Sequence, residues 1–103
     1  MEATVHTKSE LFERLREQQA AIRRLGVARL GVFGSFVRDE PTPESDVDIF
    51  VEFAPGKKTF RSFSALAELL EDVLQRRVEL VTPESLSPYI GPYILREVEY
   101  VEA

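Results

Sequence analysis

The segment from Val47 to Phe53 constrains the fold more than any other part of the sequence, because its side chains alternate with a period of two. Successive side chains of an extended strand point to opposite faces of the sheet. The alternation therefore predicts a strand with one apolar face and one acidic face. The apolar face holds Val47, Ile49, Val51 and Phe53, and the other face holds Asp46, Asp48, Phe50 and Glu52.

The residues before this strand predict three further elements. An apolar stripe at helical spacing, which Ser9 can cap and Gly26 can end, predicts a first amphipathic helix. Residues 28–33 form a short apolar segment that a Gly-Ser pair interrupts, and they indicate a buried strand. The polar stretch from Arg38 to Ser45 contains two prolines and is typical of a loop.

The second half of the chain continues the alternation of helices and strands. Apolar spacing from Phe63 to Leu74 predicts a helix of about four turns. Residues 78–81 are expected to form a third strand. Thr82 followed by Pro83 is typical of a helix start. A terminal helix is expected beyond Pro92, with one face formed by Tyr93, Ile94, Glu97, Val98 and Val101. This order predicts an α/β or α+β fold with a small mixed β-sheet flanked by helices.

Composition limits the class of protein. A chain of 103 residues with 44% hydrophobic content suits a single domain over residues 1–103 with a modest core. Its net charge of -5 repels a phosphate backbone, so long nucleic acid is an unfavourable partner. No signal segment opens the chain and no stretch approaches membrane-spanning length. We therefore expect a cytoplasmic protein that does not bind a membrane.

Asp46 and Asp48 are candidate metal ligands. At positions i and i+2 of a strand they point the same way, with Cα atoms roughly 6.6 Å apart. Their carboxylates can thus converge on shared cations. Magnesium prefers oxygen ligands and keeps part of its water shell, so a carboxylate pair completed by substrate phosphates is a suitable site.

Gly34 and Ser35 are candidate phosphate-binding residues. They follow directly on the predicted strand 28–33. Glycine permits close approach of the backbone, and successive amides at a helix start can hold phosphate oxygens. A Gly-Ser pair by itself is most often an ordinary turn. The combination with the aspartate pair is what indicates a site for a metal and a phosphate together.

These residues form a recognisable string, Gly34-Ser35-Phe36-Val37-Arg38, followed after a loop by Ser45-Asp46-Val47-Asp48. The string closely resembles the signature of the nucleotidyltransferase superfamily, in which a Gly-Ser pair precedes an Asp-x-Asp motif. Residues 36–45 separate the two motifs here. The segment from Arg77 to Leu86 and the tail are similar to the minimal nucleotidyltransferases found beside HEPN-domain partners, so the resemblance covers almost the whole chain.

The resemblance implies roles for individual residues. Asp46 and Asp48 would bridge two Mg2+ ions, and Glu79 matches the third carboxylate of the superfamily, where many relatives carry aspartate. Gly34 and Ser35 would hold the β- and γ-phosphates of ATP. Arg38 is a further candidate phosphate contact because its planar fork matches phosphate oxygens, although it could instead pair with Asp39.

The resemblance also implies a substrate and a partner. It implies an antitoxin that transfers AMP from ATP to a tyrosine of a HEPN ribonuclease toxin. Two alternatives stay open, namely an antitoxin that binds nucleotide but neutralises its partner by docking alone, and a transferase for a small-molecule hydroxyl. The tail tyrosines either fill the core or form an interface in a homo- or hetero-oligomer; they are Tyr89, Tyr93 and Tyr100.

Overall fold

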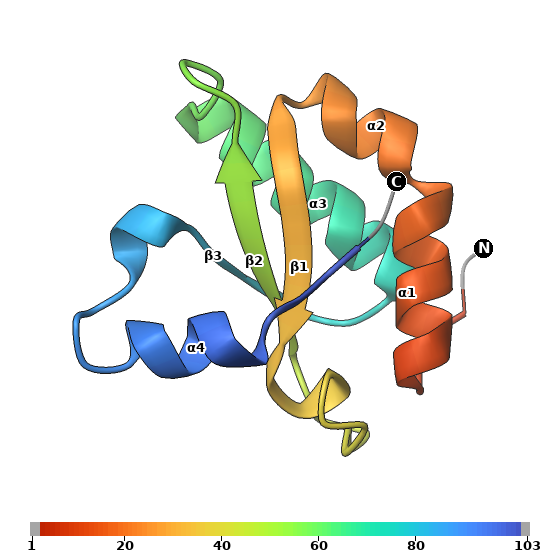
Figure 1. Cartoon of the computed structure of the whole chain (residues 1–103). Helices are drawn as coiled ribbons and strands as arrows, with labels where there is room; N and C mark the ends of the chain where they lie inside the picture. Colours follow the sequence, from red (N-terminus) through yellow and green to blue (C-terminus); the bar gives the residue numbers. More distant parts are fainter. Residues whose placement is uncertain (1–2, 102–103) are drawn as a thin grey trace.

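The computed structural model describes residues 3–101 and shows a four-stranded mixed sheet with helices packed on it (Figure 1). The strands lie in the order β3-β2-β1-β4. β1 pairs antiparallel with β2 and β4, whereas β2 and β3 run parallel. The elements are α1 (Lys8–Glu17), α2 (Gln19–Arg24), β1 (Val27–Phe33), η1 (Gly34–Phe36), β2 (Val47–Phe53), α3 (Phe60–Leu74), β3 (Val78–Val81), η2 (Pro83–Ser85), α4 (Gly91–Glu97) and β4 (Glu99–Tyr100).

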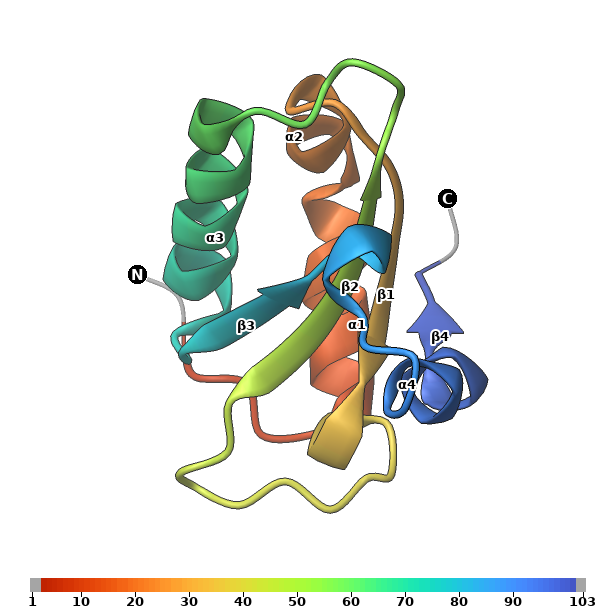
Figure 2. The same cartoon turned by 90° about the vertical axis from the view of Figure 1, so that its left-hand side faces the viewer.

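One face of the sheet carries the core. Helices α1, α2 and α3 cover this face, and Figure 2 shows α4 on the opposite side of the sheet from α3. The buried side chains come from the predicted apolar face of β2 and from the apolar stripes of the helices; they include Leu11, Leu15, Ile22, Val47, Ile49, Val51, Leu66, Leu70 and Leu74. The predicted strand, its faces and the mixed sheet flanked by helices are confirmed.

The first helix differs from the sequence prediction. The sequence predicts a single helix from a Ser9 cap to Gly26, but the structure has two helices that meet at Gln18. Thr7, not Ser9, caps α1, because its hydroxyl accepts the Glu10 N–H while the Glu10 carboxylate accepts the Thr7 N–H. This reciprocal capping pair fixes the start two residues earlier than predicted.

The C-terminal part also differs. The start at Thr82 and Pro83 is correct, but it opens only the short turn η2. The terminal helix begins at Gly91, one residue before the second proline and not beyond it, and it ends at Glu97, so Val98 and Val101 do not extend its face. Residues 99–100 instead form β4, which pairs with Gly31 and Val32 of β1. Here the pairing of residues 99–100 with β1 ends the helix, although their spacing is compatible with a helix. The periodicity of a short segment does not show that it can pair with a distant strand.

The predicted loop before β2 is held by Arg76. Its guanidinium donates to the carbonyl oxygens of Thr42 at 3.0 Å, Pro43 at 3.3 Å and Ser45 at 2.9 Å, and also to Val5 at 2.7 Å. The guanidinium also lies over the ring of Phe36, 5.1 Å from its centre. One side chain thus fixes the path by which the chain enters β2.

We expect Arg76→Ala to lower the free energy of unfolding by about 2–3 kcal/mol, because several carbonyl oxygens lose a charged donor. Arg76→Lys keeps the charge but loses the fork, so an intermediate loss is expected. The neighbouring Arg77 is the matched control, since its side chain is 82% exposed and Arg77→Ala should change stability by less than about 0.5 kcal/mol. Urea unfolding of the three variants measures this, and equal effects at both positions would contradict it.

Within residues 3–101, no helix is long and apolar enough to cross a membrane.

Candidate active site

The candidate site lies where β1 ends, opposite the beginning of β2. The strand register places Phe33 of β1 opposite Asp48 of β2, and Asp48 opposite Glu79 of β3. Gly34 follows directly on Phe33 and begins η1. Three adjacent strands therefore bring the Gly-Ser turn, the aspartate motif and the third acidic residue to one edge of the molecule, as the sequence predicts.

Gly34 lies directly against Asp48. Its φ of +78° is in the left-handed region, which favours glycine. A Cβ atom on Gly34 would lie 2.1 Å from Oδ2 and 3.0 Å from Cγ of Asp48. Only a residue without a side chain fits between this turn and the carboxylate. The position thus needs glycine for two separate reasons, backbone conformation and space.

The pKa of Asp48 is raised to about 6. The largest cause is partial burial, and the others are a hydrogen bond with the Glu79 carboxyl and the negative charges of Glu79 and Asp46; the charge of Arg38 acts in the opposite direction. Asp46, Glu79 and Arg38 are therefore near enough to act on Asp48. Within the described residues, the positive charge of Arg38 only partly offsets the negative charges that act on Asp48.

The other two acidic residues lie at the surface. Glu79 is exposed, whereas Asp46 is half-buried and has an Arg77 nitrogen 4.0 Å from its Oδ1. Between residues 3 and 101 no three His, Cys, Asp or Glu side chains are grouped so that they could hold a metal ion by themselves. The three-carboxylate metal site therefore stays a prediction.

The oxygen donors nevertheless suit magnesium. This ion is commonly held by one or two carboxylates, with water and substrate phosphates completing its shell. Asp48 and Glu79, which lie opposite each other in the register of β2 and β3, provide such a pair. A divalent cation would offset the negative charges of Glu79 and Asp46, which add to the effect of burial in raising the pKa of Asp48. Asp46 borders this pair from the start of β2.

Glu97, at the end of α4, is a site residue that sequence reasoning placed only on a helix face. Its Oε1 accepts the Gly34 N–H at 2.7 Å, and its Oε2 contacts Nη1 of Arg38 at 2.7 Å. Arg38 thus pairs with Glu97 and not with Asp39. These contacts span 63 and 59 positions along the chain, so no local pattern could have indicated them.

Partial burial by itself would raise the pKa of Glu97. The hydrogen bond from Gly34 and the contact with Arg38 outweigh burial, and the pKa is lowered below its usual value. The Glu97 side chain is therefore a carboxylate anion at neutral pH. This carboxylate binds the Gly34 amide and Arg38, two of the groups that the sequence analysis predicts to bind phosphate.

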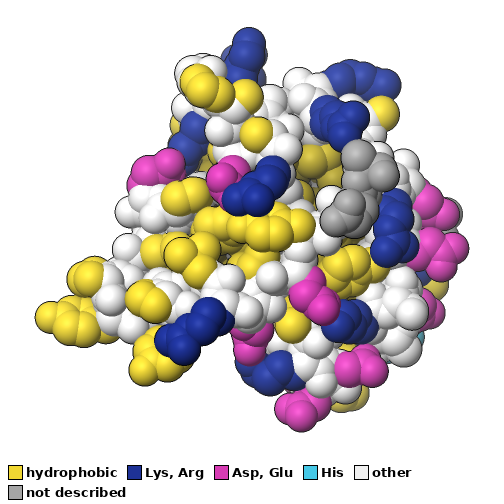
Figure 3. Space-filling view, viewed as in Figure 1, with side chains coloured by type: hydrophobic (Ala, Val, Ile, Leu, Met, Phe, Trp, Pro, Cys, Tyr) yellow, Lys and Arg dark blue, Asp and Glu magenta, His cyan; other side chains and the backbone are white. Residues whose placement is uncertain are grey.

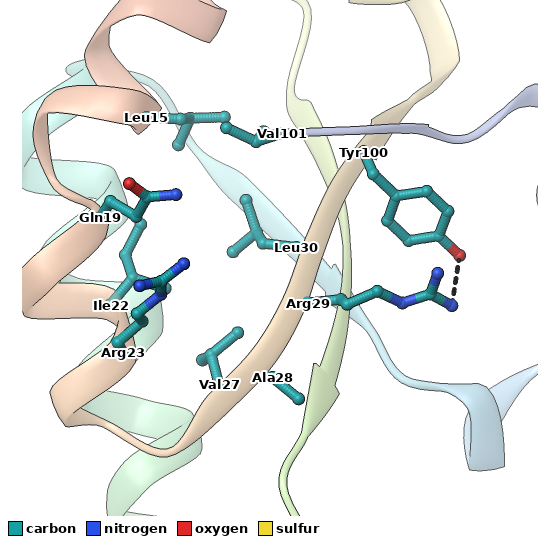
Figure 4. A pocket seen from close by; sticks show the side chains of 10 residues that line it. All are labelled: Leu15, Gln19, Ile22, Arg23, Val27, Ala28, Arg29, Leu30, Tyr100 and Val101. Atoms are coloured by element: carbon teal, nitrogen blue, oxygen red, sulfur yellow. Dashed lines mark hydrogen bonds between the residues drawn. The ribbon is translucent and has the colours of Figure 1, made fainter. Parts of the chain in front are cut away.

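A separate pocket of about 360 Å³ lies between α1, α2, β1 and β4 (Figure 4). Arg29 borders it and donates to the Tyr100 hydroxyl at 3.2 Å, and the guanidinium lies over the Tyr100 ring. None of the predicted site residues lines this pocket. Its mixed apolar and basic lining offers no acidic pair. The site around Asp48 and Glu79 therefore remains the better candidate for metal-dependent chemistry.

Comparison with known proteins relates this arrangement to one family. The sequence model of the nucleotidyltransferase domain family matches residues 9–101. A curated relative, protein adenylyltransferase MntA of Thermococcus cleftensis, is 47% identical over 78 residues, which cover 76% of this chain and 78% of the relative.

Solved structures share the fold. One provisionally described as a minimal nucleotidyltransferase is 35% identical, has a TM-score of 0.71 and aligns over 85% of this chain and 93% of its own. Another contains the tri-AMPylated HEPN toxin of Shewanella oneidensis in complex with an MNT antitoxin. It shares the fold at 19% identity and a TM-score of 0.64, over 90% of this chain and 72% of its own.

Proposed function

Because this chain belongs to the nucleotidyltransferase domain family, we propose that it transfers AMP from ATP to a tyrosine hydroxyl of a HEPN-domain toxin and thereby acts as an antitoxin. The observation that carries the proposal is the contact of Gly34 with Asp48, beside Asp46, Glu79 and Arg38. It combines a place for phosphate with a place for a cation, which AMP transfer requires. The MntA relative, 47% identical, is named for protein adenylyltransferase activity.

Each site residue has a proposed task. Gly34, Ser35 and Arg38 bind the β- and γ-phosphates through backbone amides and a guanidinium. Asp46, Asp48 and Glu79 would hold two Mg2+ ions. When bound, these ions would lower the pKa of the acceptor hydroxyl and neutralise charge on the triphosphate.

The carboxylates then orient the acceptor for attack. The tyrosine oxygen forms a bond to the α-phosphorus while the bond from that phosphorus to the oxygen bridging to the β-phosphate breaks. The products are an AMP-tyrosine phosphodiester, pyrophosphate and the released hydroxyl proton. Holding the acceptor in line with this leaving group is the main contribution that the protein itself makes.

The surface formed by α4 and the turn before it supports a protein acceptor. Hydrophobic side chains project from α4 and from the turn before it (Figure 3). Tyr89 is 85% exposed and Tyr93 67%, with Ile90 and Leu95 also exposed. Such side chains are typical of a protein interface when they gather together. We propose that this surface contacts the partner in a hetero-oligomer and that residues 1–103 form one domain, whose positions 1–2 and 102–103 lie outside the described residues.

The test is AMP labelling of the partner. The chain is incubated with Mg2+, ATP and a candidate HEPN-domain partner, with the label on either the α- or the γ-phosphate. Label from the α-phosphate should appear on the HEPN protein, whereas label from the γ-phosphate should not. Chelating the metal with EDTA should abolish labelling. An intact HEPN partner that stays unlabelled under these conditions would defeat the proposal.

The exposed apolar surface also favours a second candidate, an antitoxin that acts by docking alone. The ribonuclease activity of the HEPN partner, measured in the presence of an Asp48→Asn variant, distinguishes the two candidates. If AMP transfer is the mechanism, this variant leaves the ribonuclease active. If docking suffices, the variant neutralises it as well as the unmodified chain does.

A further inference from the structure

Glu97 occupies two donors that the proposed function assigns to the phosphates of ATP. One of its carboxylate oxygens holds the Gly34 amide and the other holds Arg38, each at 2.7 Å. Carboxylates and phosphates take the same kind of donor, namely backbone amides and guanidinium groups. The single Gly34 N–H cannot donate fully to Glu97 and to a phosphate oxygen at the same time, and Nη1 of Arg38 is likewise engaged by Glu97.

The arrangement gives Glu97 freedom to leave. Its backbone lies at the junction of α4 with β4, and β4 is fixed by the pairing of Glu99 with Val32. The side chain is 28% exposed, so it has an open side toward which it can rotate. Release therefore requires a change of side-chain rotamer and leaves the sheet intact.

We propose that Glu97 is an internal competitor of the triphosphate: its carboxylate occupies the Gly34 amide and Arg38 in the free protein and is displaced when the phosphates of ATP bind. This inference rests on the proposed function, because it assigns regulation to the same site. The consequence is a weaker apparent affinity, since ATP binds fully only to the fraction of molecules in which Glu97 has moved away.

Glu97→Gln tests the competition. The amide keeps the shape of the side chain but removes the negative charge that holds Arg38. Glu99→Gln is the matched control, because it makes the same change in net charge two residues away, where Glu99 pairs with Lys8 at 2.6 Å. Binding of a non-hydrolysable ATP analogue with Mg2+ is measured by calorimetry, without a partner protein. We expect Glu97→Gln to bind about tenfold more tightly than the unmodified chain and Glu99→Gln to stay within about twofold.

AMP provides a second comparison. It lacks the β- and γ-phosphates that compete with Glu97, so its affinity should rise less than that of the triphosphate. If Glu97 instead positions Gly34 and Arg38 for the nucleotide, Glu97→Gln should bind the ATP analogue more weakly. Weaker or unchanged binding overturns the inference while leaving the proposed function intact. Failure of the unmodified chain and of Glu97→Gln to bind the analogue overturns both.

A measurement on the unmodified chain avoids any loss of folding in the variant. The carboxyl carbon of Glu97, labelled with 13C, reports its pKa by NMR, and the pKa is lowered in the free protein. Displacement by the triphosphate removes the Gly34 and Arg38 contacts, so the pKa should rise when the ATP analogue is added. A pKa that stays low at saturation overturns the inference.

Discussion

Asp48→Asn is expected to lower the rate of AMP transfer by at least about a thousandfold, equivalent to ~4 kcal/mol of transition-state stabilisation. The amide is nearly the same size as the carboxylate, but it is neutral and binds Mg2+ poorly. The loss should appear in labelling of the HEPN partner at saturating ATP. Asp72→Asn is the matched control, because Asp72 is an exposed residue of α3 that takes no part in the site.

The same variant should be at least as stable as the unmodified chain. The raised pKa of Asp48 means that the folded state holds the proton more tightly than the unfolded state does. Its contribution to the free energy of unfolding therefore falls as the pH rises from its usual pKa of 3.8 to about 6. Because the group is about half exposed, solvent screening limits this loss to the order of 1 kcal/mol at pH 7.

Thermal unfolding without metal, followed between pH 4 and pH 7, measures this effect. The curve for Asp48→Asn should be flatter with pH than that of the unmodified chain, and the midpoint at pH 7 should be equal or higher. A variant that loses activity but gains stability indicates a residue kept for chemistry. A large loss of stability would show that Asp48 serves the fold instead.

Gly34→Ala is expected to damage both stability and activity. The new Cβ would lie 2.1 Å from Oδ2 of Asp48, and Cγ and Cβ of Asp48 are also close, at 3.0 Å and 3.3 Å. The carboxylate must therefore move away from the turn. We expect a loss of about 2–4 kcal/mol in stability, of which the positive φ accounts for about 1 kcal/mol. A misplaced carboxylate should also lower AMP transfer by about a hundredfold or more.

Gly56→Ala separates the effect of the positive φ from the effect of the clash with Asp48. Gly56 has nearly the same backbone conformation, with a φ of +75°, but nothing lies within 4 Å of the position of its Cβ. This control should lose only about 1 kcal/mol and keep full activity. Urea unfolding and partner labelling of both variants provide the measurements. Equal effects at the two glycines would show that the contact between Gly34 and Asp48 does not matter for function.

Local patterns predicted much of the site because its central residues are close in sequence to the strands that carry them. The period-two alternation of β2 determines that Asp48 points away from the apolar face. The Gly34-Ser35 interruption determines where β1 ends. Neither conclusion depends on which other segments pack nearby, so both followed from the sequence.

The tertiary structure decided the remaining features, since they depend on contacts between distant segments. Glu97 reaches Gly34 only because β4 pairs with β1 and brings the end of α4 to the turn. Arg76 reaches the loop before β2 only because β3 lies parallel to β2. The sequence alone thus predicted the candidate residues for the proposed chemistry. The tertiary structure decided that Glu97 contacts Gly34 and Arg38, because strand pairing depends on the whole chain.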